Sequence, residues 1–148
     1  MLLHALTRGW LSRGIATQRD RKAESMLGPR KELHMTRSPQ ETLAAHFEAI
    51  ASGDIDRLLA DYSEDATMLT EQGSLAGHPG VQAFYTNALQ SLPGAEFSIT
   101  DATYSSDAAL VHWTAHSGGG RVDDGVDTFV FQDGEIRLHT VHFTVQPA

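Results

Sequence analysis

Three segments after residue 38 place apolar residues at the spacing of one helical face. The first begins at Ser38-Pro39-Gln40-Glu41, a capping box in which the serine accepts a backbone N–H and the glutamate reaches back to the cap. Gly53 ends this helix, and Asp54 caps a second, short one. A third helix begins at His78-Pro79 and ends at Pro93-Gly94. The pattern therefore predicts three helices.

Five shorter runs alternate apolar and polar residues with the period of a β-strand. They are residues 66–70, 97–103, 108–117, 127–132 and 136–145. Asp133-Gly134, between the last two runs, is a two-residue hairpin signal. Most of these strands follow the helices instead of alternating with them, which is typical of the α+β class. We therefore predict a curved antiparallel sheet folded over three helices.

Composition and charge restrict the function classes. The 148 residues are 41% hydrophobic and contain no cysteine, which excludes disulfides, thiol nucleophiles and cysteine-bound zinc. No apolar run approaches the roughly 18–20 residues of a spanning helix, so we expect no membrane partner. Residues 1–37 carry eight Lys or Arg against three acids, whereas residues 38–148 carry three Arg against sixteen acids. An acidic domain disfavours nucleic acid and leaves a neutral small molecule as the expected partner.

We divide the sequence into a basic leader, residues 1–37, and a domain, residues 38–148, because the two parts differ in charge. Apolar residues lie among its arginines and no acid precedes Asp20, which is typical of an organellar transit peptide. The alternative is an upstream-start extension, with Met35 as the working start. We expect this leader to be disordered or partly helical. The expected location is cytoplasmic, or mitochondrial if the leader is a transit peptide.

Several short motifs carry a resemblance to a known family. They are Gly53-Asp54-Ile55-Asp56, Tyr62-Ser63-Glu64-Asp65-Ala66-Thr67, Gly77 before the third helix, and Asp127-Thr128-Phe129-Val130-Phe131 ahead of Asp133-Gly134-Glu135-Ile136. Across the domain, the chain resembles the NTF2-like superfamily, which includes ketosteroid isomerases and SnoaL-like polyketide cyclases. The resemblance implies a cone of three N-terminal helices packed on a curved antiparallel sheet that encloses a pocket. It also implies a homodimer through the sheet and no cofactor.

The resemblance to ketosteroid isomerases suggests positions for a site. Their strand aspartate matches Asp127, their helix tyrosine corresponds to His46, and the position of their base falls on Thr70, with Glu71 beside it. Only the aspartate is identical. The resemblance therefore implies Asp127 and His46 as catalytic residues, with Glu71 as a displaced base if the strand is offset by one position.

Asp127 is also singled out by its neighbours. Because side chains alternate along a strand, Asp127 shares a face with Phe129 and Phe131, and two aromatic residues mark that face as buried. A buried carboxylate must stay protonated or acquire a hydrogen-bonding partner, and either state is useful in acid–base chemistry. The alternative is an exposed aspartate beside Asp123-Asp124-Gly125.

Histidines supply the remaining candidates. His112 and His116 share one strand face with Thr114, opposite Val111, Trp113 and Ala115. The resemblance implies that the histidine face lines the pocket and makes His112 a third catalytic candidate; the alternative is that it faces outward and Trp113 is buried. Two histidines four apart on a strand are about 13 Å apart, too far to bind one metal ion. The predicted pocket-lining residues are Phe47, Thr70, Glu71, Thr114, His116, Phe129 and His139.

The leading functional hypothesis is a small proton-transfer enzyme of the isomerase, dehydratase or cyclase type, acting on a neutral, largely apolar molecule. A second hypothesis is a ligand-binding or assembly module without turnover. A third is a metal site that recruits histidines from several strands. We expect neither an organic cofactor nor a metal ion for the leading hypothesis.

Overall fold

The computed structural model describes residues 36–148, and within them the helices begin and end where local side chains dictate. Helix α2 (Pro39–Ser52) starts with the predicted capping box and ends at Gly53, whose φ of 69° is left-handed. The Asp54 carboxylate accepts the Arg57 N–H and caps α3 (Ile55–Leu59). Helix α4 (Gly77–Ser91) completes the predicted set of three.

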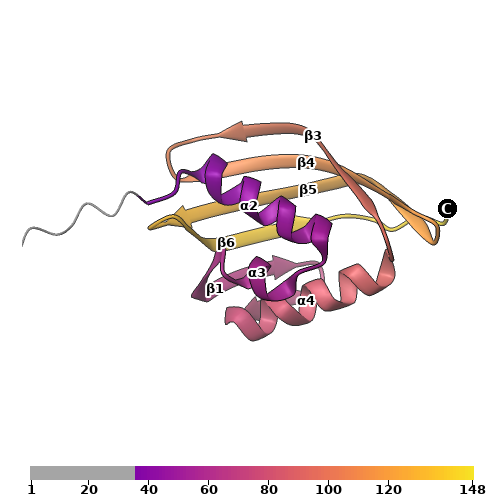
Figure 1. Ribbon diagram of the computed structural model, residues 1–148, viewed down its shortest axis with the longest axis horizontal. Helices are drawn as coiled ribbons and strands as arrows, with labels where there is room; N and C mark the ends of the chain where they lie inside the picture. Colours follow the sequence, from indigo (N-terminus) through magenta and orange to yellow (C-terminus); the bar gives the residue numbers. More distant parts are fainter. Residues whose placement is uncertain (1–35) are drawn as a thin grey trace, which may run out of the picture. The chain divides into compact units, whose positions relative to one another are not determined.

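Six strands form one sheet in the order β2-β1-β6-β5-β4-β3. Strand β1 is parallel to β6, and all other neighbours are antiparallel. Figure 1 shows α2 lying across β4, β5 and β6, with α3 and α4 near β1. The predicted α+β class is confirmed. The strands are β1 (Tyr62–Thr70), β2 (Gly73–Ala76), β3 (Glu96–Tyr104), β4 (Ala108–Ser117), β5 (Gly120–Gln132) and β6 (Glu135–His142).

The β5–β6 hairpin turns at the predicted Asp133-Gly134 pair. Both residues have positive φ, 53° and 78°, as a type I′ turn requires at its two central positions. The turn, together with a register shift between Val130 and Phe131, sets the register in which Phe129 faces His139 and Asp127 faces Val141. It therefore brings an aspartate and a histidine from adjacent strands onto the same buried face.

The core fills the space between the helices and one face of the sheet. Fully buried apolar side chains come from both layers, including Leu43, Leu58, Met68, Val81, Val111, Phe129 and Ile136. Three polar side chains, Thr42, His46 and His139, are equally buried among them. Within the described part of the chain, no helix has the length and apolarity needed to cross a bilayer. The leader lies outside the described residues except for its last two positions.

Candidate functional site

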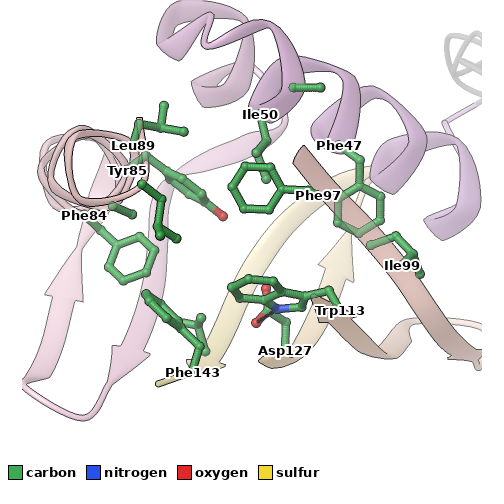
Figure 2. Close-up of a pocket in the computed structure, with 14 residues that line it drawn as sticks. Phe47, Ile50, Phe84, Tyr85, Leu89, Phe97, Ile99, Trp113, Asp127 and Phe143 are labelled. Atoms are coloured by element: carbon green, nitrogen blue, oxygen red, sulfur yellow. Dashed lines mark hydrogen bonds between the residues drawn. The ribbon is translucent and has the colours of Figure 1, made fainter. Parts of the chain in front are cut away.

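A cavity of about 120 Å³ lies between α2, α4 and the sheet, and we call it the apolar pocket. Figure 2 shows aromatic and aliphatic side chains converging on it, with Asp127 below the Trp113 indole. Asp127 is the one charged residue of its wall. The wall consists of Phe47, Ile50, Ala51, Phe84, Tyr85, Ala88, Leu89, Leu92, Phe97, Ile99, Trp113, Asp127, Val141 and Phe143.

Asp127 lies on β5 with its carboxylate held by two nitrogen atoms. The residue is 7% exposed, and the predicted inward orientation is confirmed. Trp113 Nε1 donates to Asp127 Oδ1 at 2.9 Å, and His139 Nε2 lies 2.9 Å from Oδ2. An indole nitrogen can only donate, so Oδ1 is necessarily an acceptor. The burial of this acid is therefore compensated by specific partners, as its position demands.

A glycine makes room for the Trp113 indole. Gly125 on β5 is the register partner of Trp113 on β4. A Cβ added at Gly125 would lie 2.8 Å from Trp113 Cε3 and closer still to two other ring atoms. Only a glycine therefore lets the ring lie against the β5 backbone and direct its N–H toward Asp127.

The hydrogen bonds continue from His139 through two tyrosines to His46. His139 Nδ1 lies 2.8 Å from the Tyr62 hydroxyl, which lies 3.2 Å from the Tyr85 hydroxyl. The Tyr85 hydroxyl in turn lies 3.2 Å from His46 Nε2. Tyr85 also lines the apolar pocket, and Figure 2 shows its oxygen directed toward the middle of the group. Both Asp127 and Tyr85 thus connect this buried series of hydrogen bonds, called the hydrogen-bonded chain below, to the apolar pocket.

The donor and acceptor roles along this chain follow from its ends. If Asp127 is a carboxylate, His139 donates through Nε2 and accepts the Tyr62 O–H at Nδ1. Tyr62 then accepts from Tyr85, and Tyr85 accepts from His46 Nε2. This arrangement leaves His46 Nδ1 as a bare acceptor, and that atom is buried without a hydrogen-bond partner among the described residues. The neutral form of His46 is consistent with this arrangement.

Burial favours the uncharged forms of His46, Tyr62 and Tyr85. It lowers the pKa of His46 well below 6.5, with a further contribution from His139. It raises the pKa of Tyr62 well above 10, reinforced by Tyr85, and it also raises the pKa of Tyr85, reinforced by the Asp127 charge. At neutral pH the two tyrosines therefore keep their protons and remain available as donors.

The predicted role of β4 was wrong. His112 and His116 are exposed and half-buried Thr114 shares their face, which is the one directed away from the apolar pocket. Their alternation with the pocket-facing residues was predicted, but the resemblance assigned the wrong set to the interior. The apolar set of Val111, Trp113 and Ala115 packs inward because its burial is favourable. The histidine that contacts Asp127 is His139, and His112 does not line the apolar pocket.

The other predicted residues divide into three groups. Phe47 lines the apolar pocket. His46, Phe129 and His139 are fully buried but lie outside the pocket wall, so the predicted pocket-lining role of Phe129 and His139 was wrong. Phe129 stacks on the His139 ring with centroids 4.2 Å apart. Thr70 and Glu71 line a different pocket. His46 is linked to Asp127 only indirectly, through Tyr85, Tyr62 and His139.

Several pocket residues were missed by the sequence reasoning. The sequence pattern assigned no pocket role to Tyr85 or to the rings of Phe84, Phe97 and Phe143, all of which line the apolar pocket. For Trp113 the sequence did contain a signal, because this residue lies on the more apolar face of its strand, with Val111 and Ala115. For the tyrosine chain none existed, because its members come from different elements. In the described region no three His, Asp or Glu side chains lie close enough to bind one metal ion.

Comparison with known proteins gives a family and a fold. The family model described as "SnoaL-like domain" matches residues 43–139. A SnoaL-like protein of unknown function from Burkholderia thailandensis is 20% identical to this chain, with a TM-score of 0.61. The superposition covers 71% of this chain and 93% of the Burkholderia protein. No curated protein sequence matches significantly.

Two further solved structures agree with this fold. An NTF-2 like protein of unknown function from Burkholderia xenovorans is 23% identical, with a TM-score of 0.61 and coverages of 74% and 84%. A candidate polyketide cyclase from Sinorhizobium meliloti is 20% identical, with a TM-score of 0.60 and coverages of 68% and 93%. In each case the first coverage is of this chain. At these identities the likeness concerns the fold alone.

Proposed function

This chain belongs to the SnoaL-like domain family, and from that premise we propose that it is a cofactor-independent proton-transfer enzyme. Its substrate would be a neutral, largely apolar carbonyl compound, and the reaction an isomerisation, dehydration or cyclisation. One observation carries the proposal: a carboxylate held by Trp113 and His139 at the wall of an otherwise apolar cavity. Such a carboxylate is placed to exchange protons with a bound molecule in surroundings that exclude most water.

Asp127 is the proposed general base. It removes a proton from the carbon next to the substrate carbonyl, and the electron pair of the broken C–H bond moves into an enolate-like system. The hydrogen bonds from Trp113 and His139 hold the carboxylate in one orientation while it accepts this proton. When the substrate has a β,γ C=C bond, returning the proton to the γ-carbon moves this bond into conjugation with the carbonyl group. Delivering it to a departing hydroxyl dehydrates the molecule instead.

Tyr85 is the proposed donor to the substrate oxygen. Because the pKa of its hydroxyl is raised by burial, Tyr85 carries its proton at neutral pH. Its hydrogen bonds to Tyr62 and His46 are both 3.2 Å long, so the O–H can redirect toward an oxygen bound in the pocket. Donors aimed at a developing oxyanion contribute about 10²–10³ to the rate in well-studied enzymes.

The size of the cavity restricts what its apolar part can hold. A cavity of about 150 Å³ lined by apolar side chains accommodates benzene, so the apolar pocket of about 120 Å³ accommodates about one small ring. No arginine or lysine contributes to its wall, and Asp127 already supplies a negative charge. An anionic substrate group is therefore disfavoured in this pocket.

Isomerisation of 3-cyclohexen-1-one to 2-cyclohexen-1-one tests the proposal, together with a panel of larger enone, steroid and polyketide substrates. We expect turnover by the wild type and its loss, by about 10²-fold or more, in Asp127→Asn. Asp101→Asn is the matched control, since Asp101 is an exposed aspartate on β3 outside both pockets. Equal turnover by the wild type and Asp127→Asn would remove Asp127 from the mechanism. Ligand binding without turnover of any substrate would favour a binding module.

A further inference from the structure

A second pocket adjoins the apolar one, and we call it the polar pocket. Phe84, Ala88, Val141 and Phe143 belong to the walls of both. The rings of Phe84 and Phe143 are in contact, with centroids 6.4 Å apart. Figure 2 shows these two rings on the same side of the apolar pocket. The remaining wall of the polar pocket is Thr70, Glu71, Gln72, Asn87, Ser91 and Val145.

The polar pocket is larger than the apolar pocket. The polar pocket measures about 310 Å³, against about 120 Å³ for the apolar pocket. Sites for small organic ligands usually enclose about 300–1,000 Å³, so the apolar pocket alone is too small for such a ligand. A molecule with one ring beside Asp127 and a substantial remainder must extend beyond the apolar pocket, and the polar pocket is the neighbouring cavity that shares part of its wall.

The polar groups of the second pocket are suited to an uncharged partner. On α4, Asn87 and Ser91 are one turn apart and face the same side. Ser91 Oγ donates to the Asn87 backbone carbonyl at 2.9 Å and keeps its lone pairs as acceptors. Asn87 contributes an exposed side-chain amide, which offers both a donor and an acceptor, the combination that a hydroxyl group can satisfy.

Charge argues against an acidic ligand in this pocket. Glu71 is the one charged residue of the polar pocket wall. Its carboxylate lies 2.7 Å from His142 Nδ1, and His142 is outside the wall. No lysine or arginine of the described residues lines the pocket to receive an anion. A carboxylate or phosphate arm would therefore meet repulsion without a compensating cation.

We propose that the polar pocket is a subsite for an uncharged hydroxyl-bearing arm of the substrate whose ring occupies the apolar pocket, with Asn87 as its specificity-determining residue. This inference rests on the proposed function only in treating the apolar pocket as a ligand site. The substrate class is then an amphipathic molecule with an apolar ring at one end and a hydroxylated chain at the other.

Three probes with the same phenyl ring differ in the end of their arm, which is a methyl, a hydroxyl or a carboxylate group. They are pentylbenzene, 4-phenylbutan-1-ol and 5-phenylpentanoate. Each is titrated into the full-length ¹⁵N-labelled chain. The Trp113 indole N–H reports occupancy of the apolar pocket, and the Asn87 side-chain amide reports occupancy of the polar pocket. The variant Asn87→Leu removes the proposed contact. Gln90→Leu is the matched control, because Gln90 is exposed on the same helix and lines neither pocket.

We expect the alcohol to shift both reporters and to bind more tightly than the hydrocarbon by about fivefold, the effect of one net hydrogen bond. Asn87→Leu should remove this preference, Gln90→Leu should retain it, and the carboxylate should bind more weakly than the alcohol. If Trp113 shifts but the preference is absent or survives in Asn87→Leu, the subsite is refuted and the apolar pocket stands. Tightest binding of the carboxylate also refutes it. If no probe shifts Trp113, both the subsite and the ligand role of the apolar pocket fail.

Discussion

Replacing Gly125 with alanine should detach the Trp113 indole from Asp127. The added Cβ would lie 2.8 Å from Trp113 Cε3 and closer to two other ring atoms. Restoring contacts of about 3.5–4 Å moves the ring by about 1 Å. The Nε1–Oδ1 hydrogen bond, now 2.9 Å, would then exceed bonding distance.

The expected cost has two sources. Overpacking typically costs about 1–3 kcal/mol, and a lost hydrogen bond to a charged group costs about 1.5–3 kcal/mol. Because a shift of the ring relieves part of the overpacking, we expect the free energy of unfolding to fall by about 2–4 kcal/mol. Urea denaturation followed by circular dichroism measures this change. The ¹H–¹⁵N resonance of the Trp113 indole should move at the same time.

Two comparisons make this prediction refutable. Gly118→Ala is the matched control, since its added Cβ meets nothing within 4 Å, and its stability should change by less than about 0.5 kcal/mol. In a Trp113→Ala background the cost of Gly125→Ala should largely disappear, because the clashing ring is gone. The reasoning is refuted if Gly125→Ala leaves both the stability and the indole resonance unchanged.

Further outcomes follow from the same geometry. Burial lowers the pKa of His46 well below 6.5. As the pH falls, His46 is therefore protonated in the unfolded chain before it is protonated in the folded chain, and the free energy of unfolding falls below about pH 6.5. Urea unfolding between about pH 7 and pH 5 should show a shallower fall for His46→Phe, by up to about 1.4 kcal/mol per pH unit, and equal slopes would contradict this. Tyr85→Phe should slow the turnover of the cyclohexenone substrate by about 10²-fold, and full activity would exclude Tyr85 as the oxygen donor. We also propose a homodimer through the helix-free face of the sheet, where Leu110 is 41% exposed. Analytical ultracentrifugation should show a dimer that Leu110→Asp dissociates, and a monomeric wild type would contradict this.

The elements of this fold could be predicted where local side chains decide them. The Ser38 capping box, the helix end at Gly53 and the Asp133-Gly134 hairpin turn depend only on nearby residues, and all three predictions are confirmed. The inward direction of Asp127 was also local, because Phe129 and Phe131 share its face. These predictions needed no knowledge of how the elements pack.

The composition of the site could not be predicted in the same way. Alternation separates His112 from Trp113 but does not decide which of the two faces the helices. The hydrogen-bonded chain joins α2, β1, α4, β5 and β6, so its members meet only when the sheet and helices are assembled. His139 was predicted to face inward, yet its partnership with Asp127 depends on the β5–β6 register.

Exchange of the α-protons of cyclohexanone for deuterium in D₂O, followed by ¹H NMR, tests the central claim most directly. It measures the elementary proton transfer assigned to Asp127 without requiring the natural substrate. We predict exchange faster than the buffer rate with the wild type and with Asp101→Asn, and exchange at the buffer rate with Asp127→Asn. Equal acceleration by the wild type and Asp127→Asn, or no acceleration by the wild type, would contradict the account.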